Sequence, residues 1–404
     1  MPVFKKDSTV QIVVNTSDDK WVISKGMTLV VSGTSAIYQN TAFNNDDIII
    51  AGKIINDDPV FHAVMLDGIM NEVRVEKSGS IDAVKGIYAG ASGIVGNFGT
   101  IRADEVGVEA SGVGNRGTIR ADTAVVIRGA FGGVTNGADS DIRGVQYGIY
   151  EDAGTEMVIK NSGVIEGGLA AIYSFSAGEM TLTNRGTIKG AVMMGDGNDA
   201  FINRGGKTGM SEIWGGAGDD VFQIDKVGIA IREAAGEGYD IVRTRVSHSM
   251  LDNFEQLVLE GGKAIEGFGN NEDNLIIDNN KAANVIKGFG GAAKELVPAE
   301  PAIDPVGAGD DIIYSGAGNE TMSGESGADI FAFRNGGGKD VILDFTDLED
   351  LIDLSSYSGI NSAADLATRV SMSLADTVLT LDNGDVIRIK NFDMNDLQAG
   401  DFIF

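Results

Sequence analysis

The sequence predicts an all-β protein, in which a right-handed parallel β-helix continues into a parallel β-roll and ends in a small cap of one helix and one hairpin. Two internal repeats carry this prediction, one of roughly 20 residues in the N-terminal half and one of nine residues further on. The composition agrees, because 57 glycines and only 5 prolines among 404 residues suit many tight turns between short strands. Helical periodicity is absent, and β-branched residues alternate with small or polar ones.

The longer repeat consists of a polar turn, a glycine and a short strand. A single copy cannot bury its apolar face, whereas stacked copies bury a continuous core. We therefore assign residues 1–193 to a parallel β-helix, whose rungs continue to about residue 214. We also expect the asparagine at each turn to adopt a left-handed conformation and to stack on its counterparts as a ladder. The copies start at Lys77, Asn97, Asn115, Asn136, Asn161, Asn184 and Asn203.

The shorter repeat reads G-G-x-G-x-D-x-U-x, where U is a large apolar residue. It runs without interruption through VGAGDDIIY, SGAGNETMS and GESGADIFA from Val306, and continues as NGGGKDVIL. Further copies are MGDGNDAFI, GGAGDDVFQ and AGEGYDIVR, within 194–243. Glycines permit left-handed turns that expose carbonyl groups, and aspartate supplies a hard anionic oxygen. Each unit is therefore expected to be a calcium-binding turn joined to a short strand.

These units resemble the nonapeptide repeats of the RTX (repeats-in-toxin) proteins, which form a parallel β-roll with calcium between stacked turns. The resemblance implies several Ca²⁺ ions, each held between a turn and the next turn on the same side of the roll, two units on. Carboxylates come from the aspartate position and carbonyls from the glycine positions. Carried over residue by residue, the implied ligands are Asp199, Gly216, Gly218, Asp220, Asp240, Gly307, Gly309, Asp311, Gly316, Gly318, Glu320, Gly327, Asp329, Gly338 and Asp340.

Within this set the resemblance implies defined pairs. Asp311 is expected to face Asp329, and Glu320 to face Asp340, although a glutamate departs from the pattern and its extra methylene either displaces the ion or weakens the site. The spacing of the earlier units equals one rung of the β-helix. Asp199, Asp220 and Asp240 are therefore expected to stack at one corner, and Asp344 and Asp353 are open candidates for a terminal ion.

The region after residue 193 divides into four parts. Residues 194–297 hold the first repeat block and a degenerate connector, 298–305 a proline-rich loop, and 306–354 the second repeat block. Residues 355–404 form the cap, with a short helix capped by Asn361 or Ser362 and a hairpin whose tip is Asn383-Gly384. The segment DFIF, Asp401 to Phe404, resembles the uncleaved signal of type I secretion substrates. The earlier segment DFTDLEDLIDL, which begins at Asp344, resembles the closing segment of the roll in serralysin-type proteases and alginate epimerases.

The formal net charge of −28 excludes nucleic acid as a partner and suits a chain that gathers divalent cations. No apolar run reaches the length of a membrane span, and the N-terminus lacks the features of a cleaved signal peptide. Together with the repeats, these observations predict an extracellular protein that a Gram-negative bacterium exports through a type I secretion apparatus.

The sequence is compatible with two functions. One is a non-enzymatic adhesin, matrix or surface-associated protein that binds an extracellular polysaccharide or a cell surface. The other is a polysaccharide lyase or epimerase on the β-helix. Histidine occurs only at 62 and 248, and no H-E-x-x-H motif exists, so no catalytic residue is assigned. Tyr88, Tyr150 and Tyr173 recur at one place in the rung, as a core row or a platform.

Overall fold

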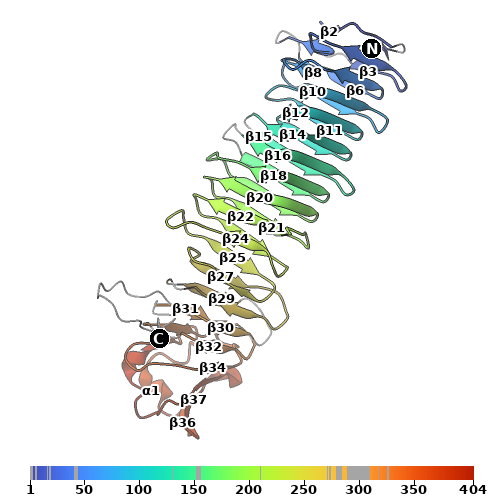
Figure 1. The fold of residues 1–404 in the computed structure, drawn as a ribbon. Coiled ribbons are helices and arrows are strands. Elements are labelled where there is room, and N and C mark those ends of the chain that lie inside the picture. Colours follow the sequence, from blue (N-terminus) through green and yellow to red (C-terminus); the bar gives the residue numbers. More distant parts are fainter. Residues whose placement is uncertain are drawn as a thin grey trace. The chain divides into compact units, whose positions relative to one another are not determined.

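The computed structural model describes residues 3–4, 7–15, 17, 20–40, 44–129, 131–151, 156–209, 211–270, 272, 274–278, 284–288, 310–316, 318–324 and 327–404. The described residues form a parallel β-solenoid with a short helix near the C-terminus, which confirms the predicted fold class (Figure 1). The chain divides into two compact units. The first comprises Met1–Asp220 with Gly228–Arg232, and the second comprises Val221–Val227 with Glu233–Phe404.

The first unit contains two sheets whose strands stack in parallel, coil upon coil. One sheet consists of β1 (Val3–Phe4), β3 (Lys20–Ile23), β6 (Asp47–Ile50), β9 (Glu72–Val75), β11 (Ile94–Asn97), β13 (Gly112–Asn115), β15 (Phe131–Asn136), β17 (Glu156–Asn161), β19 (Met180–Asn184) and β21 (Ala200–Asn203). The other consists of β2 (Ile12–Val14), β4 (Thr28–Val31), β5 (Ile37–Gln39), β7 (Lys53–Asn56), β8 (His62–Leu66), β10 (Ser80–Tyr88), β12 (Thr100–Ala110), β14 (Thr118–Ile127), β16 (Asp141–Glu151), β18 (Val164–Tyr173), β20 (Thr187–Gly195), β22 (Glu212–Gly216) and β24 (Ala230–Arg232).

The core of this unit is built from columns of identical side chains. The isoleucine of each GTIRA-like landmark pairs with the isoleucine of the next coil, and all six are fully buried. Because strand residues alternate between the two faces of a sheet, parallel in-register pairing keeps every such isoleucine inside. The column consists of Ile81, Ile101, Ile119, Ile142, Ile165 and Ile188.

The asparagines of the long repeat form the predicted ladder. Nδ2 of Asn115 donates to Oδ1 of Asn136 at 2.9 Å, and Nδ2 of Asn136 donates to Oδ1 of Asn161 at 2.9 Å. The ladder begins at Asn97 and reaches Asn203 through bonds of the same kind. The expected left-handed conformation was wrong, because these asparagines are the last residues of their strands and are not among those with positive φ. Their side-chain amides make hydrogen bonds to the neighbouring coils inside the solenoid, and an extended backbone permits this arrangement.

The second unit also contains two sheets. One consists of β23 (Val221–Ile224), β25 (Ile241–Thr244), β27 (Gln256–Leu259), β29 (Leu275–Asp278), β31 (Ile312–Tyr314), β33 (Ile330–Ala332), β35 (Leu351–Asp353) and β39 (Phe402–Ile403). The other consists of β26 (His248–Ser249), β28 (Glu266–Phe268), β30 (Val285–Lys287), β32 (Thr321–Ser323), β34 (Lys339–Ile342), β38 (Val386–Ile389), β37 (Asp376–Thr380) and β36 (Val370–Ser373). Strands of successive nonapeptides alternate between the sheets, so β31 pairs with β33 and β32 with β34.

The C-terminal cap matches the predicted helix and hairpin. Ser362 is the N-cap residue of the helix α1 (Ala363–Leu366), without a capping hydrogen bond from its side chain, and β37 and β38 pair antiparallel. Asn383 and Gly384 have positive φ at the hairpin tip. Phe402 and Ile403 form a strand that pairs in parallel with β35. The proline-rich stretch 298–305 lies outside the described residues. Among those that are described, we find no helix both long and apolar enough to cross a membrane.

Candidate calcium centres

Four buried side chains stack along one side of the second unit: Asn274, Asp311, Asp329 and Asp350. The backbone N–H of each donates to Oδ1 of the next, with distances of 2.8, 3.0 and 3.0 Å. Each residue immediately precedes a strand of the same parallel sheet. In-register pairing of these strands therefore brings the four side chains onto one line.

A second pair lies on the other side of the roll. The backbone N–H of Glu320 donates to Oδ1 of Asp340 at 2.9 Å, and both residues are buried. In the first unit, Asp199 and Asp220 follow the same rule, because the N–H of Asp199 donates to Oδ1 of Asp220 at 2.6 Å. The sequence paired these residues in the same way.

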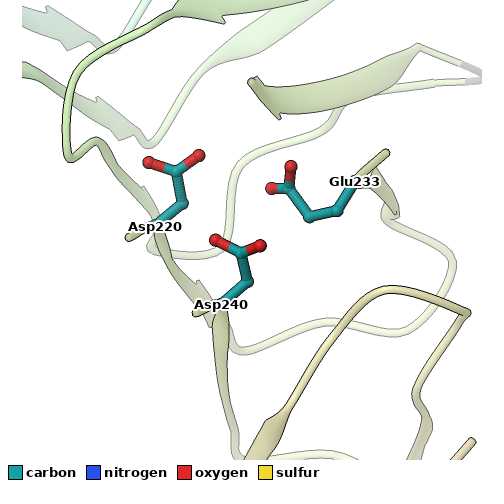
Figure 2. A group of neighbouring side chains, drawn as sticks. All are labelled: Asp220, Glu233 and Asp240. Atoms are coloured by element: carbon teal, nitrogen blue, oxygen red, sulfur yellow. The ribbon is translucent and has the colours of Figure 1, made fainter. Parts of the chain in front are cut away.

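Figure 2 shows a group of three buried carboxylates, Asp220, Glu233 and Asp240. One oxygen of each side chain lies within 4.8 Å of the others, a spacing suited to one metal ion. The backbone N–H of Asp240 donates to Oε2 of Glu255 at 2.6 Å. Glu233 lies outside the nine-residue pattern, so the repeats do not mark it as a ligand.

The electrostatics of these carboxylates favour a bound cation. Burial raises the pKa of Asp199 to about 7 and that of Asp329 to about 7, and neighbouring carboxylates add to both shifts. Burial likewise raises the pKa of Asp340 and of Asp350 to about 6, and that of Glu320 is also raised. No lysine or arginine contributes to any of these shifts. Buried carboxylates without a basic partner fit a hard divalent cation with oxygen ligands.

Two glycines leave space for the carboxylates of the main stack. A Cβ added at Gly324 would lie 1.9 Å from Oδ2 of Asp329, and one added at Gly288 would lie 2.0 Å from Oδ2 of Asp311. Such distances are shorter than any real contact, so a side chain at either position would displace the carboxylate. Gly324 is the first residue of the repeat GESGADIFA, which also contains Asp329, so it belongs to the pattern although it was not among the implied ligands. Gly288 precedes the second repeat block and faces Asp311 only after folding.

The turn glycines lie above one another. Gly218 has a φ of +123°, and a Cβ there would lie 2.4 Å from the carbonyl oxygen of Gly197. Gly338 has a φ of +109°, and a Cβ there would lie 1.7 Å from the carbonyl oxygen of Gly318. Gly216 and Gly327 also have positive φ. The carbonyl groups of successive turns thus approach the next turn closely, where they can supply neutral oxygen ligands.

Some selected positions have other partners or lie outside the described residues. The carbonyl oxygen of Gly316 accepts a hydrogen bond of 3.0 Å from Nε of Arg334. The N–H of Gly338 donates to Oδ1 of Asp385 in the C-terminal cap at 3.1 Å. Gly307 and Gly309 lie outside the described residues.

The stack ends in Asp350, which is not among the ligands predicted from the repeats. Asp350 occupies the ligand line, whereas Oδ1 of Asp353 accepts the N–H of Ser355 at 2.8 Å in a local turn. Oδ1 of Asp344 accepts the N–H of Gly324 at 3.1 Å. Asp350 precedes Leu351 and Ile352 in the D-x-U order of the repeats, and this signal could have identified it.

A separate polar group lies on the first unit. Nε2 of His62 is 3.8 Å from Oε2 of Glu109. The other carboxylate oxygen of Glu109, Oε1, is 2.7 Å from Nε of Arg128. The ring of Tyr88 is 5.6 Å from that of His62. Burial, together with the charges of Lys85 and Arg128, lowers the pKa of His62 to about 4.

The fold and these centres define a class of protein, a β-solenoid whose nonapeptide turns stack buried carboxylates for calcium. The family model of the RTX calcium-binding nonapeptide repeat (4 copies) matches residues 206–223 and 306–331. These repeats and the β-solenoid together fit an RTX β-roll protein with calcium-binding repeats.

Two curated relatives share part of the sequence. Both are from Rhizobium meliloti (strain 1021): Endo-1,3-1,4-beta-glycanase ExsH, 30% identical over 188 residues, and Endo-1,3-1,4-beta-glycanase EglC, 31% identical over 188 residues. Each match covers 46% of this chain and 34% of the relative. The chain thus spans about a third of the length of the relatives it matches.

Proposed function

We propose that this protein is an extracellular adhesin, matrix component or surface-associated protein whose fold depends on calcium and which acts without catalysis. The observation that carries the calcium part is the stack of Asn274, Asp311, Asp329 and Asp350, which buries three carboxylates beside one another. Like charges held this close oppose folding until a cation neutralises them.

Calcium would be held by the aspartates of the repeats together with carbonyl oxygens of the turn glycines. The ion supplies positive charge between successive coils, and it stabilises only the folded chain because the unfolded chain does not bring these ligands together. The residues of the chain contribute the arrangement: strand register aligns Asp311 with Asp329, and Gly324 leaves room for the carboxylate.

The dependence of folding on calcium also supports an extracellular location. RTX repeat proteins are typically secreted. A chain that folds only with calcium suits export in an unfolded state followed by folding outside the cell. We propose export by a type I secretion apparatus of a Gram-negative bacterium, supported by the repeats and by the resemblance of DFIF to a secretion signal. Outside the cell, the first unit is available to bind an extracellular polysaccharide or a cell surface.

Circular dichroism of the full chain tests the calcium part. In excess chelator, the strand signal of the second unit should be largely lost, and calcium should restore it, while magnesium at the same concentration should restore much less because it prefers to keep its water ligands. Equal strand content in chelator and in calcium would refute the proposal.

The alternative is a polysaccharide-cleaving or epimerising enzyme, and one group of side chains favours it. His62, Tyr88, Glu109 and Arg128 come from four neighbouring coils and lie together on the surface of the first unit. The lowered pKa keeps His62 neutral near pH 7, so that its ring can accept a proton, as a weaker base than an ordinary histidine. The named activity of the two relatives, glycan cleavage, agrees with this alternative.

Incubation of the calcium-loaded protein with alginate, pectin and a mixed-linked β-glucan separates the two functions. Unchanged polymer length and composition supports the adhesin. Turnover that is lost in Tyr88→Phe and in His62→Gln, with the fold retained, would establish the enzyme instead.

A further inference from the structure

Aromatic side chains recur along one line on the first unit. Tyr150 in β16 is in register with Tyr173 in β18, and the same line of partners leads back through Val126 and Glu109 to Tyr88. Residues paired in register on parallel strands point to the same side of a sheet. In the other direction the line leads through Met193 in β20 to Trp214 in β22, so that it crosses many successive coils.

Four rings on this line and beside it touch one another, and we call them the ring cluster: Tyr147, Tyr150, Tyr173 and Phe175. The rings of Tyr150 and Tyr173 are nearly parallel, 5° apart, with centroids separated by 5.8 Å. Tyr147 lies 5.2 and 5.5 Å from these two rings, and Phe175 lies 6.0 and 6.1 Å from them. Phe175 is 50% exposed.

The ring cluster does not fill the interior of the solenoid. The adjacent residues Ile149 and Ile172 face inward and are fully buried, so the core of these coils is complete without the tyrosines. On this outer face the three tyrosines are half-buried and Phe175 is exposed, so the contacting rings present an aromatic surface with hydroxyl groups. Such a surface on a soluble protein marks an interaction site.

The net charge of the chain restricts the chemical class of ligand that the ring cluster can bind. A net charge of −28 repels nucleic acids, anionic membranes and acidic polymers. The ring cluster spans two successive coils, whose strands lie about 4.8 Å apart. A ligand that extends along such a line should itself be a repeating polymer with apolar faces, and one sugar unit of an extended glycan has a length of this order. Sugar C–H faces can pack on the rings, and sugar hydroxyls can bond to the tyrosine hydroxyls and to the Arg128–Glu109 pair further along the line.

We infer that the ring cluster binds a linear, uncharged polysaccharide that lies across successive coils of the first unit. The inference deepens the proposed function and rests on its polysaccharide-binding part. It names the chemical class of the ligand and the residues that contact it. Calcium does not take part in the contact, because the rings belong to coils that precede the nonapeptide repeats.

Affinity electrophoresis of the full calcium-loaded chain in gels containing a neutral mixed-linked β-glucan tests the inference, with alginate as the anionic comparison. The variants are Phe175→Ala, which changes an exposed ring, and the double variant Tyr150→Ala/Tyr173→Ala. Tyr314→Ala is the matched control, because Tyr314 is 43% exposed on a strand of the second unit. Circular dichroism confirms that each variant folds in calcium, and Tyr150→Phe/Tyr173→Phe keeps the rings if the alanine pair does not fold.

We expect the β-glucan to retard the wild type, Tyr314→Ala and the phenylalanine pair. The double alanine variant should bind about tenfold more weakly and Phe175→Ala measurably more weakly. Equal retardation of wild type and ring variants would overturn the ring cluster as the site and leave the proposed function intact. A folded wild type that binds neither polymer would overturn the polysaccharide-binding part of the proposed function as well. Retardation by alginate but not by the β-glucan would overturn the inference that the polysaccharide is uncharged.

Discussion

The backbone N–H of Asp311 donates a hydrogen bond of 3.0 Å to Oδ1 of Asp329, which belongs to the coil two nonapeptides further along the chain. The bond fixes one oxygen of the carboxylate against the backbone, and the parallel pairing of β31 with β33 fixes the distance between the two residues. Burial then makes the charge of Asp329 costly, which its raised pKa records. The same relationship between neighbouring coils recurs at Asp199 and Asp220.

Removing the charge of Asp329 should weaken calcium-dependent folding more than removing that of Glu320. Asp329→Asn keeps the shape of the side chain and an acceptor for the N–H of Asp311, so the variant isolates the loss of the anionic ligand. We expect its calcium midpoint to rise about tenfold, and that of Glu320→Gln to rise less, because glutamate already departs from the repeat. Calcium titrations followed by circular dichroism measure both midpoints. Identical midpoints would contradict the ordering.

Gly324→Ala should destabilise the calcium-loaded second unit by about 1–3 kcal/mol, the usual cost of forcing atoms into a packed site. The added methyl would lie 1.9 Å from Oδ2 of Asp329 and would push the carboxylate off the ligand line. Gly262→Ala is the control, because a Cβ there has no neighbour within 4 Å. Urea unfolding in saturating calcium gives the difference, and a Gly324→Ala variant as stable as Gly262→Ala would argue against a carboxylate held in this position.

Asn136→Ala should destabilise the first unit by about 2–4 kcal/mol, because it leaves several buried partners unsatisfied. Asn136 donates to Asn161 and to the carbonyl of Val164, and its Oδ1 accepts from Asn115 and from Ser140. Asn97→Ala at the start of the ladder should cost less, since Oδ1 of Asn97 accepts from the backbone of Gly99 rather than from another ladder amide. Chemical unfolding in the presence of calcium compares the two variants. The ladder would carry little stability if both behaved like the wild type.

His62 should make stability depend on pH between about 6.5 and 4. Burial lowers the pKa of the folded histidine to about 4, whereas an unfolded histidine takes up a proton below about 6.5. The unfolded state therefore binds more protons in this window, and stability is lost as the pH falls through it, by up to about 3 kcal/mol. His62→Gln should remove this contribution.

Unfolding free energies measured from about pH 7 to about pH 4 in saturating calcium show the effect as a difference between wild type and variant. His248 provides a parallel case, since burial lowers its pKa to about 4 as well. These are the two histidines of the chain, so the double variant should lack both contributions. Parallel pH profiles for wild type and His62→Gln would show that His62 is not protected from protons in the folded state.

The sequence by itself determined the solenoid, the register of its coils and the line of candidate ligands, because both repeats have fixed periods. A repeat that cannot bury its own apolar face has to stack, and stacking at a fixed period places Ile101 above Ile81 and Asp329 above Asp311. The hairpin at Asn383-Gly384 was also predictable from the local sequence, since its turn needs residues that accept positive φ.

Only the tertiary structure decided which residues outside the repeats enter these lines. Glu233 and Gly288 lie close to aspartates of the repeats although both are outside the nine-residue pattern, and no local signal marks them. Parallel register likewise brought Tyr150 and Tyr173 together with Phe175, a residue of the following loop, into one aromatic surface. The tertiary structure also decided the backbone conformation of the ladder asparagines. Their side chains bond to neighbouring coils, so the backbone stays extended where a turn alone would favour the left-handed region.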